Sequence, residues 1–212
     1  MTEIRDGKKI LTTPVTDEDL RDIHIGDVIY LNGTMTACRD SAHKRLTEDG
    51  VPFPVDLAGN ALFHAGPIVR RKTDEAGNDK YEIVSVGPTT SMRMEKYEYD
   101  FVRITGTKII IGKGGMKENT VNACTEFGAI HCVTPAGCAV LGAAAVEEIE
   151  SADWLDLGMP EAVWKCRVKE FGPLIVTIDT YGRNYFEEKK VEYNRIKDEQ
   201  IAKLSEEVRS LF

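Results

Sequence analysis

The sequence predicts a single α/β domain that extends over residues 1–212. Short apolar runs with the character of strands recur along the chain, and in the second half they are separated by segments with helical periodicity. No internal repeat or low-complexity linker divides the chain, and 212 residues can bury one sizeable core. We therefore expect a strand-rich first half, an alternating strand–helix second half, and an amphipathic helix at about 187–212.

The composition excludes several classes of protein. A net charge of −8 argues against a general binder of nucleic acids or of anionic membranes. No apolar run approaches the ~20 residues of a membrane span, and the first residues lack the apolar core of a signal peptide. We expect a cytoplasmic protein with no nucleic-acid partner and no membrane partner.

The five cysteines predict neither a disulfide framework nor a metal site. Their number is odd, their spacing is irregular, and the sequence contains no Cys-x-x-Cys pair. Many zinc and iron–sulfur sites begin with such a pair. We therefore expect that this chain alone holds no metal ion and no cluster.

In the first half, several segments carry clear signals. Residues 28–31 predict a strand and residues 60–65 a short strand, and residues 8–11 predict an edge strand. Residues 16–19 combine a threonine with three acids, which is typical of a helix start. The charged segment 70–80 contains Gly-Asn and predicts an exposed hairpin or loop.

The second half alternates the two kinds of element. Strands are expected at residues 108–111, 129–133, 162–168 and 173–179, and helices at 117–127 and 136–149. The 136–149 segment is rich in glycine and alanine, which allow a close approach to another element. That element is expected within the domain, with self-association of two copies of the chain as the other possibility.

Arg39 breaks a local preference. Gly33 and Thr34 are expected to end a strand, and the helix that follows carries this arginine in its first turn. Acids are preferred there because of the helix dipole, and such a break tends to mark a functional position. The alternative is a surface arginine that is paired with a nearby acid.

Residues 85–95 predict a strand, a Gly-Pro break and a helix start. A helix N-terminus presents free N–H groups and the positive end of a dipole, which suit an anion. Arg93, one turn later, could bind a carboxylate or phosphate with two parallel hydrogen bonds. The alternative is a capped helix with a solvated arginine.

Lys113 lies in a third turn of this kind, Gly-Lys-Gly-Gly, which follows the 108–111 strand. Ligand sites of α/β sheets gather where strands give way to loops. Arg39, residues 89–93 and Lys113 together suit a small polyanion, most simply a dicarboxylate. We expect the positive charge there to be uncompensated until an anion or an adjoining subunit occupies the site. His64 could be an acid–base group or only a half-buried side chain.

Three motifs resemble the beta chain of the iron–sulfur hydro-lyases. In order, they are CRDSAHKR at 38–45, GPTTSMR at 87–93 and GKGG at 112–115. This family includes class I fumarate hydratase and L(+)-tartrate dehydratase, and in some members the unit is the C-terminal domain of a longer chain. Gly66-Pro67 and the strand that ends near Asp179 also fit, so the resemblance covers nearly the whole sequence.

The resemblance implies a swivelling β/β/α fold and a site shared with an alpha subunit that carries a [4Fe–4S] cluster. The residues that it implies for substrate binding are Arg39, Thr89, Thr90, Ser91, Met92, Arg93 and Lys113, with Thr89 also as the catalytic base. A cluster iron with an open position would act as Lewis acid for the leaving hydroxyl. The arginines would stabilise the charge that develops as the proton leaves, and a cationic, water-poor setting would favour ionised Thr89. Ser91 and Met92 stand where smaller residues are expected, which bears on substrate shape.

The function expected from the sequence is the beta subunit of a hydro-lyase that is active only with its alpha subunit. Its reaction would interconvert a 2-hydroxydicarboxylate and the unsaturated product, with fumarate and malate ahead of tartrate as substrates. A subunit that binds a dicarboxylate without catalysis is the alternative from another class. The Thr89 hydroxyl distinguishes the two, because a binding module does not require it.

Overall fold

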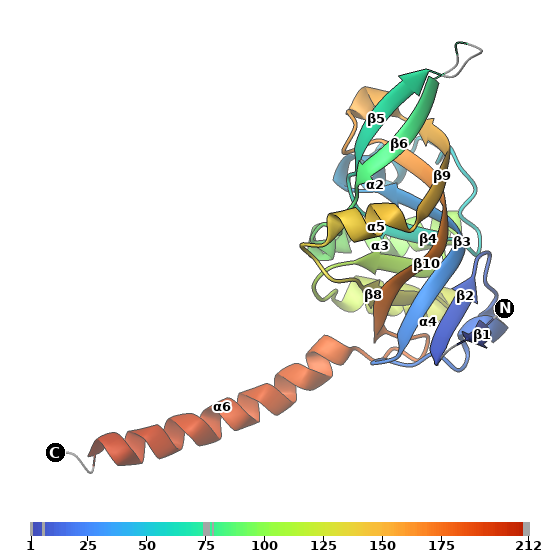
Figure 1. The fold of residues 1–212 in the computed structure, drawn as a ribbon. Helices are drawn as coiled ribbons and strands as arrows, with labels where there is room; N and C mark the ends of the chain where they lie inside the picture. The colour runs from blue at the N-terminus through green and yellow to red at the C-terminus, as the bar shows by residue number, and fades with distance from the viewer. Residues whose placement is uncertain (1, 6, 74–76, 78, 210–212) are drawn as a thin grey trace.

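The computed structural model describes every residue of the chain except 1, 6, 74–76, 78 and 210–212 (Figure 1). The described residues form ten strands, six α-helices and two short 3₁₀ helices. The predicted α/β class is confirmed. Strands dominate the first half, and helices and strands alternate over most of the second half, as expected.

Five strands form a ladder that closes on itself. They are β3 (Val28–Cys38), β4 (Ala61–His64), β7 (Ile109–Gly112), β8 (Ile130–Val133) and β10 (Val163–Ile178). The first four are parallel neighbours in that order, and β10 is antiparallel to both β8 and β3. Alternate side chains of these strands, such as Phe63, Ile111 and Trp164, fill the core that the ladder encloses.

Shorter elements extend this ladder. β2 (Lys8–Thr12) pairs with β3, β1 (Thr2–Arg5) pairs with β2, and β9 (Val146–Asp153) pairs with β10. The prediction that residues 8–11 form an edge strand is wrong, because β1 lies outside β2. The predicted helix start at residues 16–19 is confirmed by α1 (Asp17–Leu20), which opens with a capping box between Thr16 and Asp19.

Three helices cover the outer face of the parallel strands: α2 (Asp40–Thr47), α3 (Glu95–Thr105) and α4 (Glu118–Phe127). Phe101 of α3 packs with Leu62 of β4, and Val102 packs with Ile110 of β7. Burial of a large apolar side chain of this kind stabilises the fold by ~1.5–3 kcal/mol. The helices therefore hold the strand ends and the loops between them in a fixed arrangement.

The predicted helix over residues 136–149 is wrong in its second half. Only α5 (Ala139–Ala144) is helical, and the residues from Val146 onward belong to β9. Pairing with β10 overrides the local helical pattern, as tertiary context commonly does. The glycine-rich face packs within the domain, because a Cβ on Gly142 would lie 2.5 Å from the Val86 carbonyl oxygen.

The predicted strands at 162–168 and 173–179 are one strand, β10. Its register against β3 shifts on both sides of Phe171, and such bulges let a long strand bend around the core. β3 is also longer than predicted, because it continues through Gly33 and Thr34 to Cys38.

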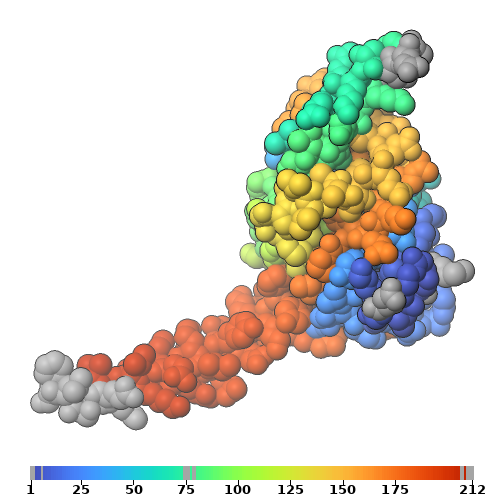
Figure 2. All heavy atoms as spheres, in the orientation of Figure 1, coloured from blue at the N-terminus to red at the C-terminus, as the bar shows by residue number. Residues whose placement is uncertain are grey.

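Two parts project from this body. The hairpin of β5 (Ile68–Thr73) and β6 (Asp79–Ser85) lies at one end and confirms the hairpin expected over 70–80, although residues 74–76 and 78 of its turn lie outside the described residues (Figure 1). At the other end α6 (Tyr185–Arg209) extends as an arm (Figure 2). Its predicted apolar face is exposed: Ile201, Leu204 and Val208 are 54%, 59% and 53% accessible. Leu211, also predicted for that face, lies outside the described residues. None of the described helices is long and apolar enough to cross a membrane.

Candidate active site

The three predicted site segments meet at the carboxyl edge of the parallel strands. Arg39 directly follows β3, Lys113 directly follows β7, and β4 lies between these strands. Residues 89–93, which we call the threonine loop, lie across the ends of β4 and β7. Loops at the carboxyl ends of parallel strands form the ligand sites of many α/β proteins.

Backbone hydrogen bonds hold the threonine loop in place. The N–H of Thr89 donates to the His64 carbonyl oxygen at 2.7 Å, and the N–H of Ser91 donates to the Lys113 carbonyl oxygen at 3.1 Å. The last three residues of the loop form a short 3₁₀ helix, η1 (Ser91–Arg93), and α3 begins at Glu95. The expectation that this turn presents free N–H groups is wrong for Thr89 and Ser91. These two N–H groups are therefore not available to a ligand.

Arg39 is the N-cap residue of α2 and not a residue of its first turn. Its Nε donates to Oε1 of Glu161 at 2.6 Å, and the other oxygen of Glu161 accepts the N–H of Ser41 at 2.9 Å. One carboxylate therefore neutralises the arginine and caps the helix. Among the described residues, the two terminal nitrogens of Arg39 donate no hydrogen bond, so they can bind a ligand.

Arg93 forms a bidentate pair with Asp40. Its Nε and Nη2 donate to the two carboxylate oxygens at 2.9 and 2.7 Å, and Nη2 also donates to Oγ1 of Thr89 at 2.8 Å. Burial is the largest single influence and acts to raise the pKa of Asp40. The hydrogen bond from Arg93, a backbone hydrogen bond and the charges of Arg93 and Arg39 together outweigh it, so the pKa is lowered. The guanidinium thus stays charged and lies directly against the Thr89 hydroxyl oxygen.

The expectation of uncompensated positive charge is wrong for both arginines, since Glu161 and Asp40 neutralise them. The pairing with a nearby acid, which was the alternative for Arg39, is present. Among the described residues, the amine of Lys113 forms neither an ion pair nor a hydrogen bond. Lys113 is half-buried, Thr90 is exposed and Met92 is 36% accessible, so these side chains are available at the surface.

Ser91 differs from the rest of the threonine loop because its side chain points inward. It is fully buried, and its Oγ lies 3.1 Å from Nδ1 of His64. The expectation that His64 is only half-buried is wrong, because its side chain is 0% accessible. A Cβ on Gly112 would lie 1.9 Å from this Oγ and 3.3 Å from His64 Nδ1. The missing side chain of Gly112 therefore makes the room in which the serine and the histidine meet.

Gly112→Ala should therefore destabilise the protein through this contact. We expect a loss of ~1–3 kcal/mol in the free energy of unfolding, the usual cost of overpacking. Chemical denaturation of the single and double variants checks the cause. In a Ser91→Ala background, where the clashing oxygen is gone, the same change should cost clearly less. An equal cost in both backgrounds would contradict the steric explanation.

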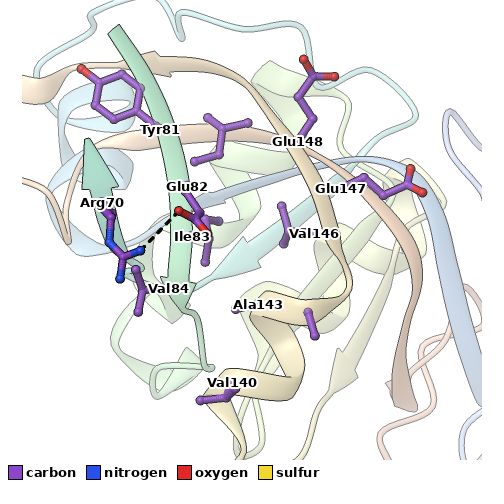
Figure 3. A pocket seen from close by; sticks show the side chains of 12 residues that line it. Arg70, Tyr81, Glu82, Ile83, Val84, Val140, Ala143, Val146, Glu147 and Glu148 are labelled. Carbon is purple, nitrogen blue, oxygen red and sulfur yellow. Dashed lines mark ion pairs between the residues drawn. The ribbon is translucent and has the colours of Figure 1, made fainter. Parts of the chain in front are cut away.

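The large groove in Figure 3 is a different surface. It has a volume of about 520 Å³ and lies between β6, α5 and β9, with Arg70 and Glu82 paired on one wall and Glu147 and Glu148 on the other side. None of the predicted site residues lines it. The candidate site is instead an open edge: the side chain of Arg93, for example, is 47% accessible.

The thiols of this chain do not fit an iron–sulfur cluster. Cys38, Cys124, Cys132 and Cys166 are buried, and burial raises the pKa of each thiol, to about 12 for Cys166. Cluster ligands are thiolates, which these groups do not readily form. The half-buried Cys138 donates a hydrogen bond to the Pro135 carbonyl oxygen at 3.2 Å.

Sequence reasoning missed the acidic partners of the site. Asp40 directly follows Arg39 and lies within the first quoted motif, so its proximity was visible but its partner Arg93 was not. Glu161 is 122 residues away from Arg39, and no local pattern connects them. His43 and Glu98, which are buried behind the site, were also missed. The contact of His43 with Arg39 could have been predicted, because residues four apart in a helix lie one turn apart.

Comparison with known proteins adds three findings. A family model described as Fumarase C-terminus matches residues 3–189. The chain is 56% identical over 201 residues to the L(+)-tartrate dehydratase subunit beta of Escherichia coli (strain K12), across 95% of this chain and 98% of that protein. It is 38% identical over 178 residues to a provisionally named fumarate hydratase class I of Geobacillus stearothermophilus, across 84% of this chain and 33% of that protein.

Proposed function

This chain belongs to the fumarase C-terminus family, and we propose that it is the beta subunit of a hydro-lyase that dehydrates a 2-hydroxydicarboxylate. The observation that carries the proposal is the convergence of Arg39, the threonine loop and Lys113 on one edge of the sheet. Three cationic side chains and a hydroxyl group match a substrate with two carboxylates and an acidic C–H bond.

L(+)-tartrate is the substrate that we favour. The Escherichia coli relative named for tartrate is 56% identical over nearly the full length of both chains, whereas the relative named for fumarate is 38% identical. This order reverses the one that the motifs alone suggested. Fumarate and malate remain the second candidates, supported by the family model.

In the proposed reaction, Lys113 and the terminal nitrogens of Arg39 bind the substrate carboxylates. Thr89 takes the proton from the carbon next to a carboxylate, a C=C bond forms as the C–O bond of the adjacent carbon breaks, and the hydroxyl leaves as water. The cluster proposed for the alpha subunit would supply a Lewis acid for that hydroxyl. The hydrogen bond from Arg93 to Oγ1 of Thr89 would stabilise negative charge on that oxygen, which a base requires. Asp40 holds the guanidinium in this orientation through two hydrogen bonds.

The rest of the site is assigned to an alpha subunit. The relatives named for tartrate are called beta subunits, and the site residues lie on an open edge. The [4Fe–4S] cluster implied by the resemblance is also placed on that partner, because the thiols of this chain do not fit one. A binding subunit without catalysis is the less favoured function, since it leaves the contact between Arg93 and Thr89 without a purpose.

The test is co-expression with the candidate alpha subunit under anaerobic conditions. The purified complex is assayed side by side with L(+)-tartrate, malate and fumarate. We expect the highest kcat/KM with tartrate. A higher value with malate or fumarate would reverse the substrate order, and no turnover with any of the three would reject the function.

Arg39→Lys and Arg93→Lys should each reduce the kcat/KM of this complex. Lysine keeps the charge but loses the planar fork. A charged hydrogen bond contributes roughly 1.5–3 kcal/mol, so the loss should be about 10- to 100-fold. The control is Arg103→Lys, because Arg103 is an exposed arginine in the last turn of α3, at the opposite end of that helix from the threonine loop, and its described partner is Asp100. Wild-type kinetics from both site variants would exclude Arg39 as a carboxylate ligand and Arg93 as the group that stabilises the Thr89 oxygen.

A further inference from the structure

Glu98 is an acid that the reaction scheme does not use. It lies on α3 with its side chain fully buried, and neither of its carboxyl oxygens has a hydrogen-bond partner in the described part of the chain. A carboxylate without donors in such a place is strongly destabilising, because its charge is removed from water and nothing replaces the lost hydrogen bonds. The structure around it must therefore remove the charge or neutralise it.

His43 of α2 faces Glu98 with an unprotonated nitrogen. Its Nδ1 lies 2.9 Å from the Arg39 carbonyl oxygen, and since a carbonyl only accepts, Nδ1 carries the proton. Burial lowers the pKa of His43 to about 4, so the ring is neutral near pH 7. Its Nε2 is then a bare acceptor, and it lies 3.9 Å from Oε2 of Glu98.

His64 of β4 approaches the same oxygen from another side. Its Nε2 lies 3.4 Å from Oε2 of Glu98, and its Nδ1 lies beside the Ser91 hydroxyl. Burial lowers the pKa of His64 to about 3, so this ring is also neutral. If the Ser91 hydroxyl donates to Nδ1, then Nε2 carries the proton and can donate to Glu98.

One proton on Glu98 gives both facing ring nitrogens a partner at Oε2. A carboxylic acid O–H can donate to Nε2 of His43 while the same oxygen accepts from Nε2 of His64. Both N···O distances are longer than that of a hydrogen bond, but a shift of the carboxyl group by about 1 Å would bring either one to hydrogen-bond length. A divalent cation fits less well. Three ligand atoms within 4.8 Å of one another would leave a tetrahedral ion one donor short in a fully buried place.

We infer that Glu98 is held as a neutral carboxylic acid that donates its proton to His43 and accepts a hydrogen bond from His64, and that this buried triad positions Arg39 and the threonine loop. His43 is bonded to the backbone of Arg39, and His64 is bonded to Ser91 by its side chain and to Thr89 by its carbonyl oxygen. The triad thus joins both halves of the site from behind. The positioning role rests on the proposed function, whereas the protonation of Glu98 does not.

Glu98→Gln is the decisive variant. An amide is a neutral isostere of the acid. Its NH2 group in the place of Oε2 can donate to Nε2 of both rings when His64 takes the tautomer whose Nδ1–H donates to Oγ of Ser91. The chain should fold, and kcat/KM of the complex should stay within about threefold of wild type. Glu98→Leu removes the partner that His43 and His64 share. We expect about a tenfold loss of kcat/KM even where the variant folds. A loss with Gln as large as with Leu would overturn the proposal.

Glu95→Gln is the matched control, one turn earlier on the same helix. The two oxygens of Glu95 accept the N–H groups of Lys117, Asn119 and Thr120 and the Thr120 hydroxyl. Four donors suit an anion with two oxygens, and an amide has only one. The same substitution should therefore lower the denaturation midpoint at position 95 and spare it at position 98.

The pH profile of stability supplies a readout that is independent of activity. Burial raises the pKa of Glu98 from its ordinary value of 4.5 to about 7. Between these values the unfolded chain releases a proton that the native chain keeps, so wild type loses stability as pH rises through this window. Glutamine does not titrate. The midpoint of Glu98→Gln relative to wild type should therefore rise between about pH 5 and about pH 8.

The other titratable groups near Glu98 do not account for this pH-dependent difference in the denaturation midpoint. They are His43 of α2, His64 of β4, Cys38 of β3 and Cys124 of α4, with Glu95 on its own helix. The two histidines and two thiols are neutral across the window and are present in both proteins. A midpoint difference that is constant with pH would reject the proton on Glu98. If wild type binds one equivalent of metal and Glu98→Gln binds none, the triad holds a cation instead of a proton, and the proposal is rejected. If no substrate is turned over, these stability measurements still decide the protonation.

Discussion

Thr89→Ala should reduce the kcat of the reconstituted complex by about 10²–10⁴-fold, the usual share of a positioned general base. Thr89 is the only hydroxyl residue of the threonine loop whose oxygen accepts a hydrogen bond from an arginine among the described residues. That contact favours negative charge on the oxygen. Steady-state kinetics with tartrate, malate and fumarate measure the loss.

Folding should survive this substitution. The variant loses one hydrogen bond from the charged Arg93, which is worth at most about 1.5–3 kcal/mol on this partly exposed loop, while the bidentate pair of Arg93 with Asp40 remains. Thr89→Ser is the matched control, because it keeps the hydroxyl, and it should retain part of the activity. If Thr89→Ala keeps more than about a third of wild-type kcat, Thr89 is not the base.

The chain purified without its alpha subunit should be folded, colourless and without turnover. It supplies cations and a hydroxyl group on an open edge, and its thiols do not fit a cluster. Addition of an iron-loaded alpha subunit under anaerobic conditions should restore turnover and bring the absorbance of a cluster. Absorbance spectra and kinetics before and after mixing provide the measurement.

Exposure to air distinguishes the contribution of the alpha subunit from that of this chain. The activity of the complex should decay in air, because the cluster is oxidised. This chain, treated with air alone and then mixed with fresh alpha subunit, should regain full activity, because four of its five thiols are buried. Strong dehydratase activity from the isolated, iron-free chain would reject the proposal that this chain supplies only half of the active site.

The sequence by itself determined the features that depend on neighbours in the chain. The capping box at Thr16, the strands at β4, β7 and β8, and the helix α4 all follow from local spacing, and the structure agrees with them. The three motifs at strand ends were predicted to converge, and they do so because parallel strands end at one edge. The chemical roles of their residues stay predictions.

Only the tertiary structure decided the features that depend on distant residues. Residues from Val146 form a strand because β10 offers them a partner, which no local pattern reveals. Arg39 and Arg93 are neutralised by Glu161 and Asp40, and Glu98 meets His43 and His64, because separate helices and strands are packed against one another. A periodic pattern reports which face of an element is buried. It does not report which charged groups from other elements are buried beside it, and those groups determine the charge of the site.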